Sequence, residues 1–236
     1  MKPTRSPFAA ALALVSSVLL SCSGGSSNPP AQPAGSSTAP APAKIEPAAA
    51  PSSARPGLET PADAQTQPPV YAMIETSMGD IVLELNRHKA PISVENFLSY
   101  VDRGFYDGTI FHRVISDFMI QGGGFDKNLK KRSTRPGIEN EADNGLKNAR
   151  GTVAMARTRN PHSATSQFFI NVKTNSPLDH RAKNELGWGY TVFAKVVEGM
   201  KVVEAIERVK TGACGRFAKD CPLEQVELIK VQLIEN

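Results

Sequence analysis

The stretch "FHRVISDFMIQGGG", residues 111–124, sets charged and polar side chains among Phe, Val, Ile and Met and then ends at three glycines. Such apolar density is typical of strands in a protein core. Because successive side chains of a strand point to opposite faces, Arg113 is expected to share a face with Phe111 and Ile115. His112 is expected on the other face. A guanidinium does not lose its charge, so an arginine buried in this way needs acceptors close by.

A second apolar run, "SQFFINV" (166–172), is also typical of a strand. The two stretches together predict an apolar floor with a guanidinium and two amides at its rim. The floor would consist of Phe118, Met119 and Phe169, and the rim of Arg113, Gln121 and Gln167. A pocket of this kind suits a small apolar ring attached to a peptide backbone. The spacing alone is equally compatible with an ordinary core that contains a structural arginine.

Short strand-like segments dominate the chain after about residue 70, and only two segments have helical spacing. The first helical segment, 90–104, has Pro91 at its start and Gly104 at its end, and the second contains Val202, Val203 and Ile206. Strands are expected within 71–86 (a hairpin around 77–80) and at 110–115, 118–121, 151–156, 166–172, 190–197 and 226–234. This pattern indicates a mainly β fold, a closed barrel or sandwich with helical caps.

The N-terminal third of the chain has a different composition. Residues 1–21 combine a basic start, a short apolar run and small residues, which predicts a secretory signal rather than a membrane span. Cys22, in "LLSC", resembles the lipidated cysteine of bacterial lipoproteins; the alternative is an ordinary signal peptide that takes Cys22 away with it. Residues 22–69 are nearly all Pro, Ala, Ser, Gly, Thr and Gln. They lack the large apolar side chains that offset ordering entropy, so a disordered linker is expected.

Charge and cysteine content narrow the choice of partners. The chain carries a net charge of +4, and its basic cluster at 127–135 has no aromatic residues interleaved for base stacking. We therefore expect a solvated loop there and no nucleic-acid partner. Cys214 and Cys221 lie close together in sequence, and in an exported protein such a pair favours a disulfide over two free thiols. The chain has no CxxC motif and no histidine at metal-ligand spacing, so no metal site is expected.

Four motifs now point to one family. "FHRVISDFMIQGGG", "NEADNGLKNARGTVAMA", "MARTRNPHSATSQFFINV" and "GWGYTVFAKVVEGMKVVEAI" resemble, in that order, the cyclophilin family of peptidyl-prolyl cis–trans isomerases, and its bacterial members in particular. The resemblance runs from about residue 71 to the C-terminus. It implies that residues 70–236 form a closed eight-stranded antiparallel β-barrel capped by two α-helices, with a proline pocket on the outer face of the barrel.

The resemblance also implies roles for individual residues. Arg113 matches the catalytic arginine, and Gln121 and Gln167 match residues that hold this arginine and the peptide backbone. His112 matches the histidine beside the arginine. The proline pocket and the adjoining substrate contacts match Phe118, Met119, Phe169 and Leu178, followed by Ala156, Arg157 and Tyr190.

The chain departs from the family pattern at the rim of the pocket. Many members have Asn at the position of Arg157, and many eukaryotic members have His at the position matched by Tyr190. Eukaryotic members often have Trp at the position of Pro177, and the immunosuppressant cyclosporin uses that indole. Trp188 lies in an inserted loop, where we expect it to pack as an ordinary aromatic side chain.

These features predict an exported peptidyl-prolyl cis–trans isomerase that assists the folding of exported or unfolded proteins. The reaction requires no metal and no cofactor. The expected partners are proline-containing polypeptides and, through a lipid on Cys22, a bacterial membrane on its periplasmic side; the protein is expected to be a monomer. The alternative is a non-catalytic module that binds prolyl peptides or acts as a chaperone.

Overall fold

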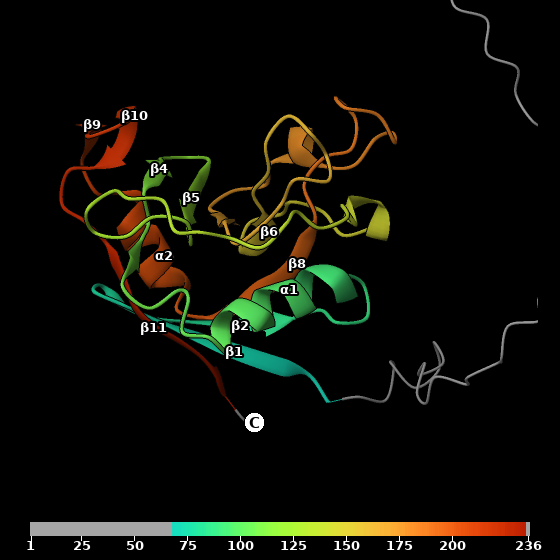
Figure 1. The fold of residues 1–236 in the computed structure, drawn as a ribbon, viewed down its shortest axis with the longest axis horizontal. Coiled ribbons are helices and arrows are strands. Elements are labelled where there is room, and N and C mark those ends of the chain that lie inside the picture. The colour runs from blue at the N-terminus through green and yellow to red at the C-terminus, as the bar shows by residue number, and fades with distance from the viewer. Residues whose placement is uncertain (1–67, 235–236) are drawn as a thin grey trace, which may run out of the picture. The chain divides into compact units, whose positions relative to one another are not determined.

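The computed structural model describes residues 68–234. The predicted signal segment 1–21, the lipidation site Cys22 and nearly all of the predicted linker 22–69 lie outside the described residues. Within 68–234, no helix is both long enough and apolar enough to cross a bilayer. Figure 1 shows this part of the chain as a curled sheet with two α-helices and a separate two-stranded hairpin.

Nine strands form one antiparallel sheet in the order β3-β11-β1-β2-β8-β6-β7-β5-β4. Their bounds are β1 Val70–Thr76, β2 Gly79–Leu85, β3 Thr109–Ile110, β4 Arg113–Ile115, β5 Met119–Gly122, β6 Thr152–Met155, β7 Phe168–Asn171, β8 Val192–Glu198 and β11 Glu227–Ile234. The predicted hairpin is present as β1 and β2, which pair from Val70 opposite Leu85 to Thr76 opposite Gly79. The prediction of a mainly β, antiparallel fold is therefore confirmed.

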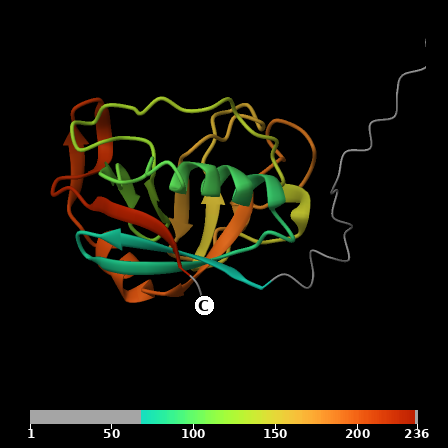
Figure 2. The same cartoon turned by 60° about the horizontal axis from the view of Figure 1, so that its bottom comes forward.

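The two ends of this sheet are neighbours in the chain. β3 pairs with β11 and β4 pairs with β5, and only residues 111 and 112 separate β3 from β4. Because this link is so short, the two ends lie close together, and Figure 2 shows the curl of the sheet. Counted as one strand, 109–115 reduces the nine strands to the eight expected. The predicted continuous strand at 110–115 is nevertheless interrupted. Its first part, in β3, pairs with β11, and its second part, β4, pairs with β5.

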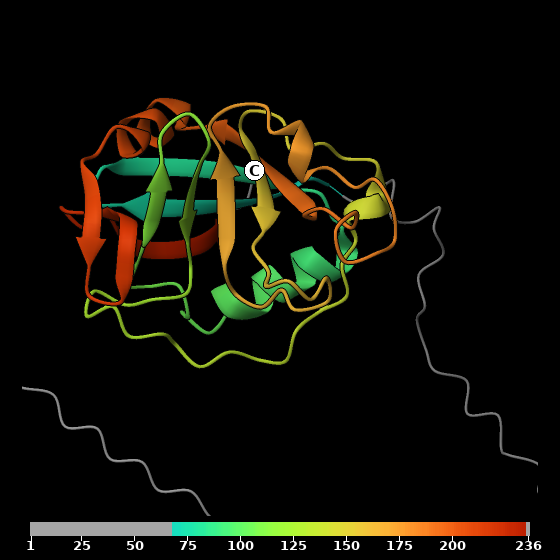
Figure 3. The same ribbon diagram turned by 90° about the horizontal axis from the view of Figure 1, so that it is seen from above.

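The two helices lie at opposite ends of the curled sheet (Figure 3). Helix α1, Pro91–Val101, begins with proline at its first turn, as predicted, and ends three residues before Gly104. The carboxylate of Glu141 accepts hydrogen bonds from the main-chain N–H groups of residues 92 and 93, which have no partner inside the helix. Helix α2, Met200–Glu207, buries Val203 and Ile206 in the same core cluster as α1.

The strands divide their apolar side chains between two clusters. In β7, Phe168 and Ile170 belong to the large cluster inside the sheet, whereas Phe169 between them belongs to a smaller cluster. In β5, Ile120 points inward and Met119 belongs to the smaller cluster. Because side chains alternate along a strand, the smaller cluster lies on the outer face of the sheet. Both faces of β7 are covered, which explains why all four of its residues are buried.

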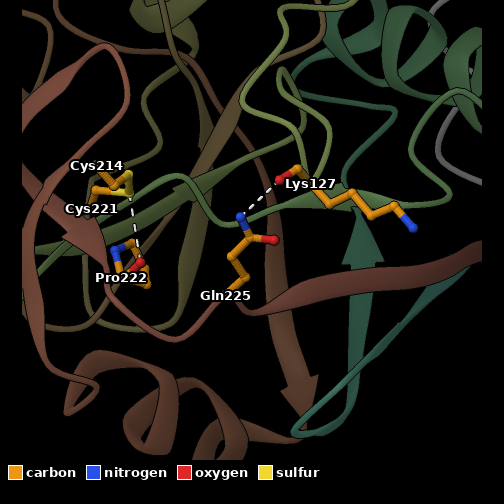
Figure 4. The surroundings of a disulfide bond; sticks show 5 residues. All are labelled: Lys127, Cys214, Cys221, Pro222 and Gln225. Atoms are coloured by element: carbon orange, nitrogen blue, oxygen red, sulfur yellow. Dashed lines mark hydrogen bonds between the residues drawn. A yellow bond between two sulfur atoms is a disulfide. The ribbon is translucent and has the colours of Figure 1, made fainter.

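A hairpin that was not expected precedes the last strand. It consists of β9, Thr211–Cys214, and β10, Phe217–Pro222, and it packs beside β4 (Figure 1). A disulfide joins Cys214 of β9 to Cys221 of β10. Figure 4 shows how the chain then continues: Gln225 donates a hydrogen bond of 2.8 Å to the carbonyl of Lys127. The hairpin is mostly polar and exposed, so its sequence has no apolar alternation that could have predicted it.

Candidate active site

A pocket of about 540 Å³ lies on the outer face of the sheet. Every residue predicted to contact a substrate lines it, from strands β4, β5 and β7 and from the segments around them. These residues are His112, Arg113, Phe118, Met119, Gln121, Ala156, Arg157, Gln167, Phe169, Leu178 and Tyr190. Two further aromatic residues, Phe125 and Phe217, also line the pocket and were not predicted. The volume is in the range of sites for small ligands, which is about 300–1,000 Å³.

The floor of the pocket is the smaller apolar cluster. Met119 and Phe169 are buried within it, and Phe118, Leu178 and Tyr190 pack against them from loops and a short 3₁₀ turn. The rings of Phe169 and Tyr190 meet edge to face with their centroids 5.6 Å apart. This arrangement holds the aromatic side chains in fixed positions, as is usual for such ring pairs. The predicted apolar floor is therefore present.

Arg113 is placed by the pairing of β4 with β5, where it lies opposite Gln121. Its side chain is 42% exposed, and its Nε lies 3.6 Å from a carboxylate oxygen of Asp220 in the hairpin. The expectation that Arg113 shares a face with Phe111 is wrong. Phe111 belongs to the interior cluster, because the break at 111–112 shifts the alternation of side chains by one residue. Ile115 does lie on the outer face with Arg113, against the floor.

The two amides form one unit at the rim. The side-chain nitrogen of Gln121 donates a hydrogen bond of 3.0 Å to the side-chain oxygen of Gln167. The family resemblance implied that these amides hold Arg113, and this role stays a prediction. Among residues 68–234 the charged partner of Arg113 is Asp220. Gly124 gives Gln167 its space, since a Cβ at that position would lie 2.5 Å from its Cγ. This contact explains the last glycine of the 111–124 stretch.

His112 is a buried, uncharged ring at one side of the pocket. Only 3% of its surface is exposed, and its Nδ1 has no hydrogen-bond partner among the described residues. Burial lowers the pKa of His112 from 6.5 to about 4, with a smaller lowering from the charge of Arg113. At neutral pH the ring is therefore neutral. It lies against Phe125, with the two ring centroids 4.6 Å apart.

Residues 156–157 and Tyr190 form another part of the pocket lining. Arg157 donates a hydrogen bond of 2.9 Å from Nε to the carbonyl of Gly189, and its guanidinium lies 4.6 Å from the centre of the Tyr190 ring. The main-chain N–H of Ala156 donates to the carbonyl of Gln167 at 2.9 Å. Arg157 thus has a structural role at the rim that asparagine, without a guanidinium, would not fill in the same way.

Pro177 and the inserted-loop residue Trp188 are not part of the floor. Pro177 lines an adjoining hollow of about 390 Å³ together with Arg157 and Tyr190. Trp188 is only 9% exposed and packs between His162 and His180, at 5.0 and 5.4 Å between ring centroids. This packing agrees with the expectation that Trp188 is an ordinary buried aromatic residue.

Sequence reasoning missed three residues that reach the site: Phe125, Phe217 and Asp220. The last two are in the hairpin, between the cysteines of the disulfide. The cysteine pair was the only sequence feature that pointed to this segment. It predicted that residues 214–221 form a loop closed by a disulfide, but it did not predict where that loop packs. Nothing in the sequence indicated that this loop folds back onto β4.

Comparisons with known proteins agree with this geometry. A family model described as "Cyclophilin type peptidyl-prolyl cis-trans isomerase/CLD" matches residues 71–232. A peptidyl-prolyl cis-trans isomerase of Streptomyces antibioticus is 58% identical over 161 residues, which cover 68% of this chain and 96% of that protein. Peptidyl-prolyl cis-trans isomerase B of Escherichia coli strain K12 is 54% identical over 160 residues, covering 68% and 97%.

The same comparison holds at the level of structure. The crystal structure of a Cryptosporidium parvum cyclophilin type peptidyl-prolyl cis-trans isomerase, obtained in the presence of the dipeptide Ala-Pro, matches with a TM-score of 0.56 and 25% identity. The match covers 70% of this chain and 99% of that one. These relatives are therefore about as long as the described part of this chain.

Proposed function

This chain belongs to the cyclophilin-type peptidyl-prolyl cis–trans isomerase family and has its isomerase activity, and on this premise we propose that Arg113 is the catalytic residue and the outer-face pocket is the substrate site. The observation that carries the proposal is that a guanidinium, two amides and an apolar floor line a single pocket. The floor suits a prolyl ring, and the polar rim suits the peptide backbone on either side of it.

The chemistry that the pocket has to perform is rotation about one bond. Resonance gives a peptide C–N bond a rotation barrier of about 18–20 kcal/mol. Unaided isomerisation of X–Pro bonds takes tens to hundreds of seconds. When the bond twists, the lone pair localises on the prolyl nitrogen, which becomes a hydrogen-bond acceptor. A donor to that nitrogen binds the twisted state more tightly than either planar state, and this difference accelerates rotation.

Arg113 is suited to be that donor. The carboxylate of Asp220 lies on the Nε side of its guanidinium, at 3.6 Å. A guanidinium has five N–H donors, and within residues 68–234 the two terminal nitrogens have no ion-pair partner, so they can reach the substrate. Gln121 and Gln167 are hydrogen-bonded to each other through one nitrogen and one oxygen. The side-chain oxygen of Gln121 and the side-chain nitrogen of Gln167 can therefore bind the peptide backbone. The step forms no covalent bond and uses no cofactor.

The experiment that tests this proposal is an isomerase assay on the fragment 70–236 with a prolyl tetrapeptide. The fragment is expected to fold by itself, because the relatives consist almost entirely of this domain. We expect faster cis–trans exchange that depends on Arg113. Binding of unfolded chains without any acceleration of exchange would instead support a non-catalytic prolyl-binding or chaperone module.

The place of action belongs to the same proposal. We propose that residues 1–21 direct export, that Cys22 is lipidated and that 22–69 tether the isomerase to a bacterial membrane facing the periplasm. There it would act on exported, unfolded proteins. Supporting this are the composition of the N-terminal segment and the cysteine pair, which is typical of oxidising compartments. Labelling with palmitate in the wild type, and its loss in Cys22→Ala, is the expected result; equal labelling of both would contradict lipidation at this residue.

A further inference from the structure

The hairpin β9–β10 forms part of the pocket wall. Phe217, at the start of β10, lines the pocket and is half-buried. Its ring centroid lies 5.5 Å from that of His112 and 5.1 Å from that of Phe125, where it meets the ring edge to face. His112 and Phe125 are themselves 3% and 6% exposed, so they form a fixed platform under Phe217. We call these three rings the hairpin wall.

The hairpin wall is separate from the floor that suits proline. The floor residues form one apolar cluster, and none of the three rings of the wall belongs to it. Both surfaces nevertheless line the same pocket of about 540 Å³. A pocket of this volume accommodates more than one prolyl ring, so a peptide that places its proline on the floor can place a neighbouring side chain against the wall.

The chemistry of the wall defines what it can bind. Two of its rings are phenyl groups, and the imidazole of His112 is neutral at pH 7, as described above. The nearby charges of Arg113 and Asp220 have opposite signs and largely offset each other. Aromatic rings gain from edge-to-face contact with other rings, and such contacts contribute beyond simple burial of area. One cation, Arg216, already lies 5.5 Å from the centre of the Phe125 ring. The wall therefore suits an aromatic or large apolar side chain and offers little to a second cation.

Two features hold the wall in position. The Cys214–Cys221 disulfide closes the hairpin across β9 and β10. Asp220 adopts a left-handed conformation, with φ of +63°, in which its carboxylate meets Arg113. Residues other than glycine rarely adopt this conformation, although Asp tolerates it better than most, and such residues concentrate at functional sites. The hairpin is therefore anchored at both its covalent link and its contact with β4.

We propose that Phe217, with His112 and Phe125 beneath it, forms a second subsite that binds an aromatic or large apolar side chain next to the proline of the substrate. This inference rests on the proposed function, because it places a prolyl peptide in the pocket. It assigns a role to a segment that lies outside every motif on which the family resemblance was based. Phe217 is then a specificity-determining residue, and the disulfide keeps it in place.

The test is a matched set of tetrapeptides in which the residue before or after proline is Ala, Phe, Leu or Glu. We expect the wild type to show a higher kcat/KM for Phe than for Ala at one of the two positions. The expected ratio is about 3- to 10-fold, the size of an edge-to-face ring contact. Phe217→Ala should bring that ratio to about one. The control Lys219→Ala, an exposed residue of the same hairpin, should leave the ratio unchanged.

The possible results distinguish a failure of the subsite proposal from a failure of the catalytic proposal. If the wild type fails to isomerise even the Ala peptides, the proposed catalytic function is wrong. If it isomerises them and Phe217→Ala keeps the full preference for Phe, the subsite is wrong and the catalytic proposal stands. A second measurement uses only the wild type and does not depend on how the variant folds. Nuclear Overhauser contacts between the substrate's Phe ring and the ring of Phe217 are expected, and contacts only to the floor would overturn the inference.

Discussion

Replacing Arg113 by alanine should separate catalysis from folding. Its side chain is 42% exposed and its ion pair with Asp220, which is 22% exposed, spans 3.6 Å. Pairs of this kind contribute about 0.2–1 kcal/mol to stability, so Arg113→Ala should lower the free energy of unfolding by less than about 1 kcal/mol. The same change removes a donor that is used mainly in the twisted state. Losing one such donor raises a barrier by about 2.7–4 kcal/mol, or 10²–10³ in rate.

Two further variants identify which property of the guanidinium matters. Arg113→Lys keeps the charge but loses the planar fork, so it should also be poor. Arg150→Ala is a matched control, because Arg150 is likewise about half exposed and paired with one carboxylate, that of Glu204, yet does not line the pocket. It should keep wild-type turnover.

The assay follows cis–trans exchange of one prolyl tetrapeptide for all these variants, with urea unfolding of each as the test of folding. A folded Arg113→Ala protein with near-wild-type exchange would refute the proposed mechanism. A large loss of stability in that variant would refute the estimate of its ion pair.

Three other predictions follow from particular residues. Because the pKa of His112 is about 4 when folded and about 6.5 when unfolded, the unfolded chain takes up a proton first as pH falls. Urea unfolding should therefore show stability lost between pH 6.5 and 4, by up to about 3 kcal/mol, and His112→Gln should remove this dependence while exposed His88→Gln should not. Reduction of the Cys214–Cys221 disulfide should lower the unfolding free energy by about 2–3 kcal/mol, since the closed loop is short, and free thiols in protein purified without a reducing agent would contradict the pairing. With Pro177 in place of an indole, cyclosporin should inhibit roughly 30- to 1000-fold more weakly than in Trp-bearing relatives, and equally tight inhibition in a drug titration would contradict this.

Much of the site was predictable because its residues lie in strands with a clear pattern. Two strands contain adjacent apolar residues, Met119 and Ile120 in β5 and Phe168 and Phe169 in β7. Adjacent residues of a strand point to opposite faces, so both can be buried only if the sheet is covered on both faces. The pattern therefore predicted an apolar floor, and the resemblance to the cyclophilin family implied that it lies on the outer face. The same reasoning failed at Phe111, because alternation holds only while a strand keeps the same neighbours.

The sequence by itself determined the antiparallel β class, the two helices, the apolar floor and the candidate arginine, since each depends on short-range periodicity or on a local motif. Only the tertiary structure showed that Asp220 is the charged partner of Arg113 among the described residues, and that Phe217 and Phe125 complete the pocket. These contacts join segments about a hundred residues apart through a polar hairpin with no periodic pattern. Their position follows from the closure of the whole sheet, which no local stretch of sequence encodes.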